Sequence, residues 1–209
     1  YWARSYVGWS RISSAIPNAG HLALAKAESQ GKIRTLVTQN VDGLHQKAGS
    51  NLVVDLHGRL DRVKCMSCEW VITRAEMDTA LAELNPSVNR DVSFEFTPDG
   101  DAEVEASADF KVPNCAKCQG LLKPDVVFFG ESVSTQIVEF AMGAVLRSEA
   151  LLVAGTSLQV NSGLRFVRRA ARAGIDVVIV NLGPTKADDL AIAKIEANTS
   201  LVLGALLDV

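Results

Sequence analysis

The chain has 209 residues, 48% of them hydrophobic, and a formal net charge of −3. This length and apolar content suffice for the core of one large domain, or of one domain with a small insert. Lysine and arginine are scattered singly, so no basic stripe would neutralise a phosphate backbone, and no nucleic acid partner is expected. The longest apolar runs have the length of strands, well short of the ~20 residues that span a bilayer, so no membrane segment is expected.

Helices and short apolar strands alternate along the chain. Residues 17–32 predict a helix that begins at Pro17 and ends at Gly31. Short continuous apolar runs are typical of buried parallel strands, and they occur at residues 34–40, 150–157, 176–183 and 199–204. Such an alternation predicts an α/β fold with an open parallel sheet.

Two helical patterns separate the later strands. Residues 134–148 place five apolar side chains on one face, namely Ile137, Val138, Ala141, Val145 and Leu146. Residues 163–174 predict a helix whose inward side chains are Leu164, Val167 and Ala171. The arginines on the opposite face of this second helix are expected to be solvated: Arg168, Arg169 and Arg172.

All four cysteines fall into two Cys-x-x-Cys pairs separated by 46 residues: Cys65, Cys68, Cys115 and Cys118. Four thiolates in this pattern favour a structural, tetrahedral Zn²⁺ site without an open coordination position. Four buried or free thiols and an iron–sulfur cluster are the alternatives.

The metal interpretation fits a reducing compartment, and we expect a cytoplasmic protein, with the mitochondrial matrix as the alternative. The intervening chain includes a polar, acidic stretch at residues 97–110 that predicts a flexible surface excursion.

Polar side chains follow the first predicted strand, where Gln39, Asn40 and Asp42 come directly after an apolar run. In open α/β sheets ligands bind beyond the carboxyl ends of the strands. Amides beside a carboxylate can bind ribose hydroxyls and a carboxamide. The alternative is an Asx turn, in which Asn40 and Asp42 bond only to local backbone.

Two further strand ends carry candidate ligand groups. Residues 154–157 form a turn of small residues that would let backbone N–H groups and hydroxyls approach a phosphate. Asn181 ends the next strand, where it would bind a second ribose or act only as a turn residue. No G-x-G-x-x-G occurs, so a dehydrogenase with the usual fingerprint is not supported.

His57 is the candidate general base, because it ends an apolar run beside a glycine that would leave the ring approachable. A packed structural histidine is the alternative for His57, and it is the favoured interpretation for His21 and His45. Residues 126–131 predict a strand that ends at a glycine, either as core or as an edge that could add an extended peptide.

Several strings in this order resemble the sirtuins, which are NAD-dependent protein deacylases: TQNVDGLH, LHG, the paired Cys-x-x-Cys, KPDVVFFGE, AGTSLQV and VIVNLG. The stretches YWARSYVGW, SLQVNSGLRFVRRAA and VNLGPTKADDLA look closest to class II of this family. The resemblance covers essentially the whole chain. It implies a Rossmann-like parallel sheet in two segments, residues 1–60 and 127–209, with a small zinc-binding module at 61–126 between them.

The resemblance implies an enzyme that removes acyl groups from the lysines of a protein or peptide, releasing nicotinamide and O-acyl-ADP-ribose. Mono-ADP-ribosyl transfer and a non-catalytic zinc-ribbon interaction module are the alternatives. A Ser-His hydrolase is not supported, because no G-x-S-x-G occurs.

The roles of individual residues follow from the resemblance. His57 would be the general base, assisted by Asn40 and Asp42. The residues that match the NAD contacts are Gln39, Asn40, Asp42, Gly155, Thr156, Ser157, Asn181 and Leu182. The residues that match the acyl-lysine tunnel and the peptide slot are Val127, Phe128, Gly130 and Glu131.

The sequence departs from the family pattern at two places. After Val160 it reads QVNSG, whereas many deacetylating members have a proline two residues after the valine, so the substrate slot is expected to be shaped differently. The family's first βα unit, with its Gly-Ala-Gly phosphate turn, is not in this sequence. We therefore expect the chain alone to bind NAD poorly.

Overall fold

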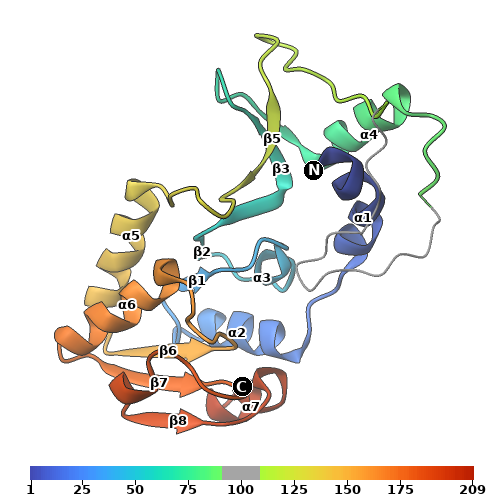
Figure 1. Cartoon of the computed structure of the whole chain (residues 1–209). Coiled ribbons are helices and arrows are strands. Elements are labelled where there is room, and N and C mark those ends of the chain that lie inside the picture. Colours follow the sequence, from blue (N-terminus) through green and yellow to red (C-terminus); the bar gives the residue numbers. More distant parts are fainter. Residues whose placement is uncertain (91–108) are drawn as a thin grey trace. The chain divides into compact units, whose positions relative to one another are not determined.

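The computed structural model describes residues 1–90 and 109–209, which form two compact units (Figure 1). The first unit comprises Tyr1–Ala15 and Gly58–Val126, and the second comprises Ile16–His57 and Val127–Val209. The acidic excursion expected at residues 97–110 lies almost entirely outside the described residues. In the part of the chain that is described, no helix has both the length and the apolar character needed to cross a membrane.

The first unit is built on an antiparallel sheet with the strand order β4-β3-β5. Its elements are α1 (Trp2–Ser14), β3 (Gly58–Cys65), β4 (Val71–Thr73), α4 (Arg74–Leu84) and β5 (Leu122–Val126). Helix α4 begins with a capping box, in which the side chains of Thr73 and Glu76 each accept a backbone N–H of the other residue. Its buried side chains join those of α1 and β3 in a small apolar core that includes Tyr6, Val63, Met77 and Leu81.

Helix α1 belongs to the first unit. The segment division implied by the resemblance had instead grouped residues 1–60 with the parallel sheet. The indole Nε1 of Trp2 donates a hydrogen bond of 2.9 Å to the carbonyl oxygen of Leu122 on β5. Trp2 and Tyr6 are buried in the core of this unit. Contacts between residues distant in sequence thus hold α1 here.

The second unit has the expected α/β architecture with parallel strands, in two sheets of order β1-β2 and β6-β7-β8. Its strands are β1 (Leu36–Thr38), β2 (Val53–Asp55), β6 (Ala150–Ala154), β7 (Asp176–Val180) and β8 (Ala193–Ile195). Its helices are α2 (Ala19–Ser29), α3 (Leu44–Lys47), α5 (Thr135–Leu146), α6 (Asn161–Arg172), the 3-10 helix η1 (Asp188–Leu190) and α7 (Thr199–Leu206).

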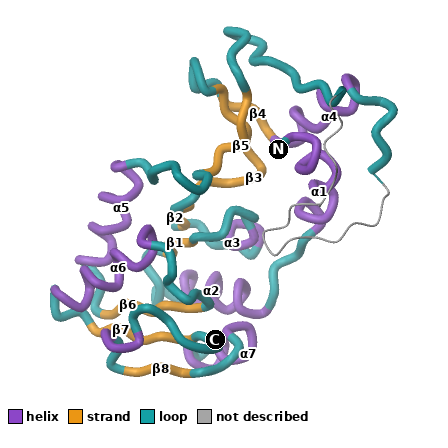
Figure 2. The backbone as a smooth tube through the Cα atoms, in the orientation of Figure 1, coloured by secondary structure: helices purple, strands orange, loops and turns teal. Residues whose placement is uncertain are grey.

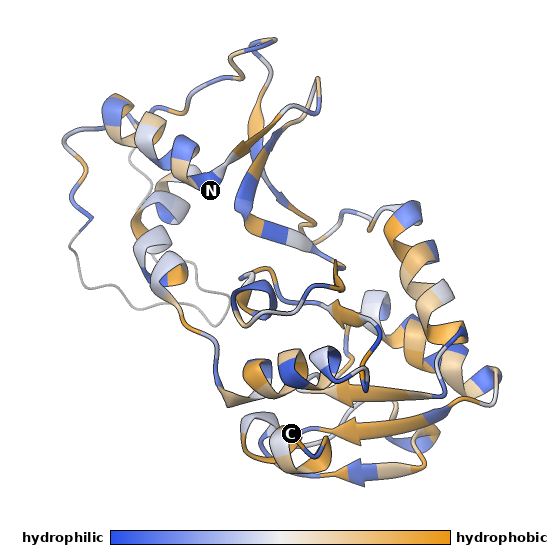
Figure 3. Ribbon diagram, turned by 180° about the vertical axis from the view of Figure 1, so that it is seen from behind, coloured by the Kyte–Doolittle hydropathy of each residue, from blue (hydrophilic) through white to orange (hydrophobic). Residues whose placement is uncertain are grey.

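The core of the second unit is apolar and lies between β6, β7 and the helices α5 and α6, which lie side by side (Figure 2). Strands β6 and β7 are hydrophobic along most of their length (Figure 3). The helix faces predicted to point inward supply Ala141, Val145, Leu164 and Val167 to this core. Leu146 was predicted on the same face but is 41% exposed, because α5 ends there.

Residues 199–204 form helix α7, so the prediction of a fourth buried strand there was wrong. The side chain of Asn198 accepts the backbone N–H of Ser200 at 2.9 Å, which caps a helix start. Leu203 is 2% exposed while Leu201 is 81% exposed, so the segment buries one face only. Helix α7 packs against α2.

The strand predicted at residues 126–131 was also wrong, because β5 ends at Val126. Beyond it the backbone N–H of Phe128 donates to the Glu131 carboxylate, and the N–H of Glu131 donates to the carbonyl oxygen of Phe128. Gly130 has a φ of 90°, which glycine adopts without strain. A turn therefore replaces the strand. Helix α2 begins at Ala19, capped by Asn18, rather than at Pro17.

Candidate active site

Gln39, just after β1, and His57, just after β2, lie at one edge of the second unit. Strands β1 and β2 are parallel, and their register pairs Thr38 with Asp55, so both chains leave the sheet at the same level. The side-chain amide of Gln39 then donates to Thr156 Oγ1 at 3.1 Å, in the loop after β6. One side chain thus joins the end of β1 to the end of β6.

The start of α6 comes close to the same amide. A Cβ atom built on Gly163 would lie 2.8 Å from Gln39 Oε1, which is closer than real Cβ contacts come. Glycine at this position therefore allows the first turn of α6 to approach Gln39.

His57 is held by both of its ring nitrogens. Nδ1 lies 3.0 Å from the carbonyl oxygen of Gln39, and Nε2 lies 2.8 Å from the hydroxyl oxygen of Ser162. A carbonyl oxygen only accepts, so Nδ1 carries the proton and Nε2 of the neutral ring accepts from Ser162. The imidazole therefore lies at the polar strand edge, with Nε2 as its basic atom.

Gly58 follows His57 for a different reason from the one predicted. A Cβ at this position would collide with the carbonyl oxygen of Asp125 on β5, and its φ is 79°. The close approach of β3 to β5 thus requires glycine here, whatever the access to the imidazole.

Asn40 and Asp42 behave differently from each other. The Asn40 residue is exposed, and its side chain makes no hydrogen bond with any residue that the structure describes. One carboxylate oxygen of Asp42 accepts the backbone N–H of Leu44 at 2.9 Å, which is the Asx-type bond considered as the alternative. Asn40 thus offers a free amide, while Asp42 also shapes the start of α3.

The loop after β6 exposes Gly155 and Ser157, and Gly155 has a φ of 66°. After β7, the side-chain amide of Asn181 donates to the carbonyl oxygens of Leu182 and Gly183. Asn181 is thus a turn residue in this structure, and Leu182 beside it is exposed.

The residues predicted for the substrate slot begin beside His57, because the backbone N–H of Val127 donates to the carbonyl oxygen of His57 at 2.9 Å. Phe128, Gly130 and Glu131 form the turn that follows. Phe129, between them, is 96% exposed.

The other two histidines pack against each other with ring centroids 4.7 Å apart. Desolvation lowers the pKa of both His21 and His45 below the ordinary value, and the negative charge of Asp42 partly offsets this. His21 also completes the capping box of α2 with Asn18. Both therefore have the structural role that the sequence favoured.

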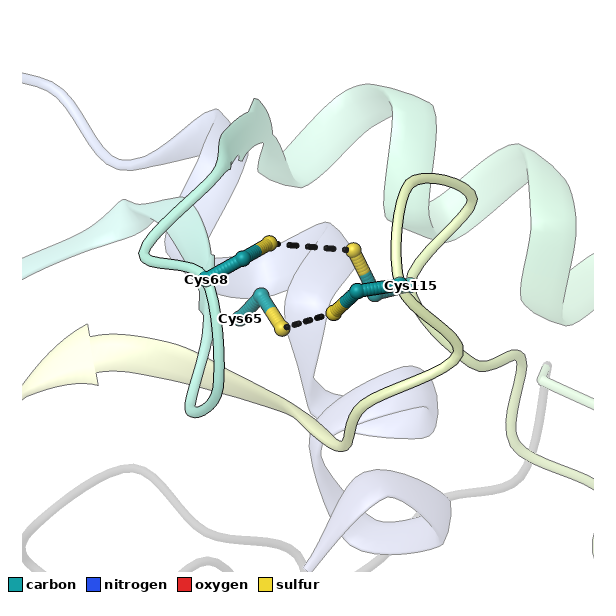
Figure 4. A group of neighbouring side chains, drawn as sticks. Cys65, Cys68 and Cys115 are labelled. Atoms are coloured by element: carbon teal, nitrogen blue, oxygen red, sulfur yellow. Dashed lines mark hydrogen bonds between the residues drawn. The ribbon is translucent and has the colours of Figure 1, made fainter.

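In the first unit the four cysteines turn their sulfur atoms toward one another (Figure 4). All four Sγ atoms lie within 4.8 Å of one another, with 3.4 Å between Cys65 and Cys118 and 3.7 Å between Cys68 and Cys115. Four thiolates ~2.3 Å from a tetrahedral ion would lie ~3.8 Å apart. The cluster thus fits a metal ion.

Comparison with known proteins places the chain in a family. The family model described as the Sir2 family matches residues 1–162. The chain belongs to the Sir2 family. It is 50% identical over 208 residues to an NAD-dependent protein deacetylase of Xanthomonas campestris pv. campestris (strain 8004), covering 99% of this chain and 71% of that protein. It is 48% identical to NAD-dependent protein deacetylase 2 of Bradyrhizobium diazoefficiens, covering 99% and 76%.

Solved sirtuin structures share the fold. The structure named "Sir2-p53 peptide-NAD+" matches with a TM-score of 0.77 at 32% identity, covering 95% of this chain and 72% of that one. The structure named "Sir2 bound to acetylated peptide" matches with a TM-score of 0.76 at 31% identity, with the same coverage.

Sequence reasoning missed two residues of this sirtuin's site, Ser162 and Gly163. Both lie in the first turn of α6, more than 100 residues from His57, and neither follows a strand directly. The available signal was the sequence QVNSG itself, where the chain departs from the proline of many family members.

A cavity of about 410 Å³ lies on the outer side of α6 and contains none of the predicted site residues. Its lining residues are Met142, Asn161, Arg165, Arg168, Arg169 and Arg172. The three arginines predicted to be solvated are exposed on this surface.

Proposed function

We propose that this protein is an NAD-dependent protein-lysine deacylase that releases nicotinamide and transfers the acyl group of a lysine side chain to ADP-ribose. The observation that carries the proposal is the placement of His57. Its ring is fixed at the strand edge by Gln39 and Ser162, with a free amide, Asn40, in the adjoining loop. Relatives at 48–50% identity are NAD-dependent protein deacetylases, which supports the same chemistry here.

The residues around this edge suit a dinucleotide. Among the described residues the Asn40 side chain has no hydrogen-bond partner, Asp42 has a carboxylate oxygen beyond the one bonded to Leu44, and Gln39 closes the edge against Thr156. The NAD contacts that we propose are Gln39, Asn40, Asp42, Gly155, Thr156, Ser157, Asn181 and Leu182. When bound, NAD supplies the glycosidic bond that is cleaved and the ribose that receives the acyl group.

In this arrangement His57 acts as the general base and takes a proton from a hydroxyl at Nε2. Its Nδ1–H stays bonded to the carbonyl of Gln39, which stabilises the imidazolium that forms. Asn40 and Asp42 orient the groups that react. A general base of this kind contributes about 10²–10⁴-fold to the rate.

We propose that the acyl-lysine enters beside Val127 and Phe128, with the peptide backbone along Gly130 and Glu131. Val127 is bonded to the backbone of His57, so this slot begins beside the base. The neighbouring exposed Phe129 offers an apolar surface to an extended peptide.

For the four cysteines, we propose that they hold one structural Zn²⁺ with no open position. A cytoplasmic location agrees with thiols that remain reduced. The competing function is mono-ADP-ribosyl transfer, which would use the same base and cofactor contacts.

The test is to incubate the protein with a panel of acyl-lysine peptides, at NAD concentrations high enough to offset the weak binding expected of this chain alone. Nicotinamide and O-acyl-ADP-ribose are followed by mass spectrometry. We expect both products, and a loss of at least about 100-fold for His57→Ala. Ser148→Ala is the control, because its hydroxyl donates to the Val145 carbonyl and Ser148 is not among the residues proposed for the site. Nicotinamide release without acyl transfer would favour ADP-ribosylation, and no nicotinamide with any peptide would refute the proposal.

A further inference from the structure

Ser162 occupies an unusual place for a serine of a first helical turn. Such a hydroxyl usually accepts a backbone N–H or faces water. Here it lies 2.8 Å from Nε2 of the candidate base, and the residue is 8% exposed. The N-cap of α6, Val160, makes no side-chain cap bond, so the serine is not engaged in capping.

Two adjacent residues shape this turn to fit the site. Gly163 makes room for the side chain of Gln39, and Ser162 reaches the ring of His57. The Gln39 residue itself bonds to His57 through its carbonyl oxygen and to Thr156 through its side chain. The chain of contacts therefore runs from Thr156 through Gln39 and His57 to Ser162.

A hydroxyl can serve both protonation states of an imidazole. In the resting protein it donates to the single Nε2 lone pair. When the reacting hydroxyl donates to that lone pair instead, the Ser162 O–H turns away, and Ser162 Oγ then accepts the Nε2–H of the imidazolium. Ser162 stays neutral throughout, because the proton taken from the reacting hydroxyl ends on Nε2. Neither alanine nor proline can do this, and each would leave Nε2 without this partner at a partly buried position.

We propose that Ser162 is a positioning residue that holds His57 in its Nδ1–H tautomer with Nε2 as the proton acceptor. This inference rests on the proposed function for its kinetic part. The contact between the two side chains is independent of that function.

The variants test the effect of the Ser162 hydroxyl separately from any effect on folding. Ser162→Ala and Ser162→Pro both lack it, and proline is tolerated in a first helical turn. Ser162→Thr keeps the hydroxyl. Ser148→Ala removes a hydroxyl elsewhere in the second unit and is the matched control.

The first readout needs no cofactor. ¹⁵N NMR of the His57 side chain is expected to show the Nδ1–H tautomer in the original protein, with that proton exchanging about tenfold faster in Ser162→Ala and Ser162→Pro. Ser162→Thr and Ser148→Ala should leave the exchange unchanged. An Nε2–H tautomer in the original protein, or equal exchange in all variants, would overturn the proposal.

The second readout is turnover. Loss of the hydroxyl is expected to lower kcat by about tenfold while KM for NAD changes less than twofold, with recovery in Ser162→Thr. Unchanged kcat in either hydroxyl-free variant, or a folded Ser162→Thr that fails to recover, would contradict the proposal. If the original protein shows no turnover, the proposed function fails, and the NMR result still decides whether Ser162 positions the ring.

Discussion

The two units place their polar groups in opposite ways. In the first unit charged and thiol groups lie at the centre: Arg74 is 2% exposed, and Cys65 and Cys115 are fully buried. In the second unit the centre is apolar, and the polar side chains stand where parallel strands end. Buried polar groups in the first unit bond to one another and hold it together, whereas those at the second unit's edge leave donors and acceptors for a ligand.

The largest effect is expected on removing the Zn²⁺ that we propose for the first unit. Binding of a structural zinc contributes about 10–16 kcal/mol of apparent free energy, which is more than a small core supplies. Cys115→Ser, or a strong chelator, should therefore unfold this unit. All three tryptophans, Trp2, Trp9 and Trp70, lie in it, so their fluorescence reports on this unit alone.

Met66→Ser is the control for the cysteine variant, because Met66 lies in the other Cys-x-x-Cys turn of the same cluster and is exposed. It should leave both the fluorescence and its response to chelator unchanged. Tryptophan emission that is the same with and without chelator would mean that the cysteines hold no structural ion.

The next effect concerns Arg74, which is buried among aromatic rings. Its guanidinium lies 4.7 Å from the ring centroid of Trp9 and 5.6 Å from that of Trp2, and it pairs with Asp78 at 3.1 Å. Arg74→Ala should cost about 3 kcal/mol in the free energy of unfolding, measured by denaturant and tryptophan fluorescence. Arg90→Ala removes a more exposed partner of the same carboxylate and should cost about 1 kcal/mol. Equal losses would show that burial of Arg74 is not what matters.

The second unit should respond to the loss of apolar volume instead. Leu164 is buried between α6 and the parallel strands, so Leu164→Ala should cost about 3 kcal/mol through the cavity it leaves. Circular dichroism should detect this loss. Leu201→Ala, at an exposed position of α7, should cost less than about 0.5 kcal/mol. A similar loss of unfolding free energy in both leucine variants would show that an apolar core is not what stabilises the second unit.

The sequence predicted the secondary-structure elements that are determined by residues close together in the chain, and it missed those that depend on distant contacts. The strands at residues 36–38, 150–154 and 176–180 were found because burial on both faces gives continuous apolar runs. Residues 199–206 have the same composition, and only the Asn198 cap and the exposure of one face identify a helix. Helix α1 was missed because Trp2 is held by a bond to Leu122, far along the chain.

For the site, Gln39 and His57 were each singled out because they follow an apolar run, and the parallel pairing of β1 with β2 brings them to one edge of the sheet. Ser162 was not, since no strand-end rule applies to the second residue of a helix. The clustering of the four cysteines was predictable from their spacing alone, and their role as zinc ligands stays a prediction.

The smallest effect is the pH dependence that histidines give to the second unit, which holds all three of them. Desolvation lowers the folded-state pKa of His21 and His45, so the unfolded chain binds protons more readily. Their contribution to stability is full above the unfolded value of about 6.5 and is lost as the pH falls below it. Asp188 titrates outside this window, because its bond to Lys194 lowers its pKa to about 2.

Denaturant unfolding followed by circular dichroism between pH 7.5 and 5 should show the loss of stability, and His45→Gln should reduce that loss. Stability that rises on acidification would mean that the two rings are charged in the folded protein, contrary to their mutual packing.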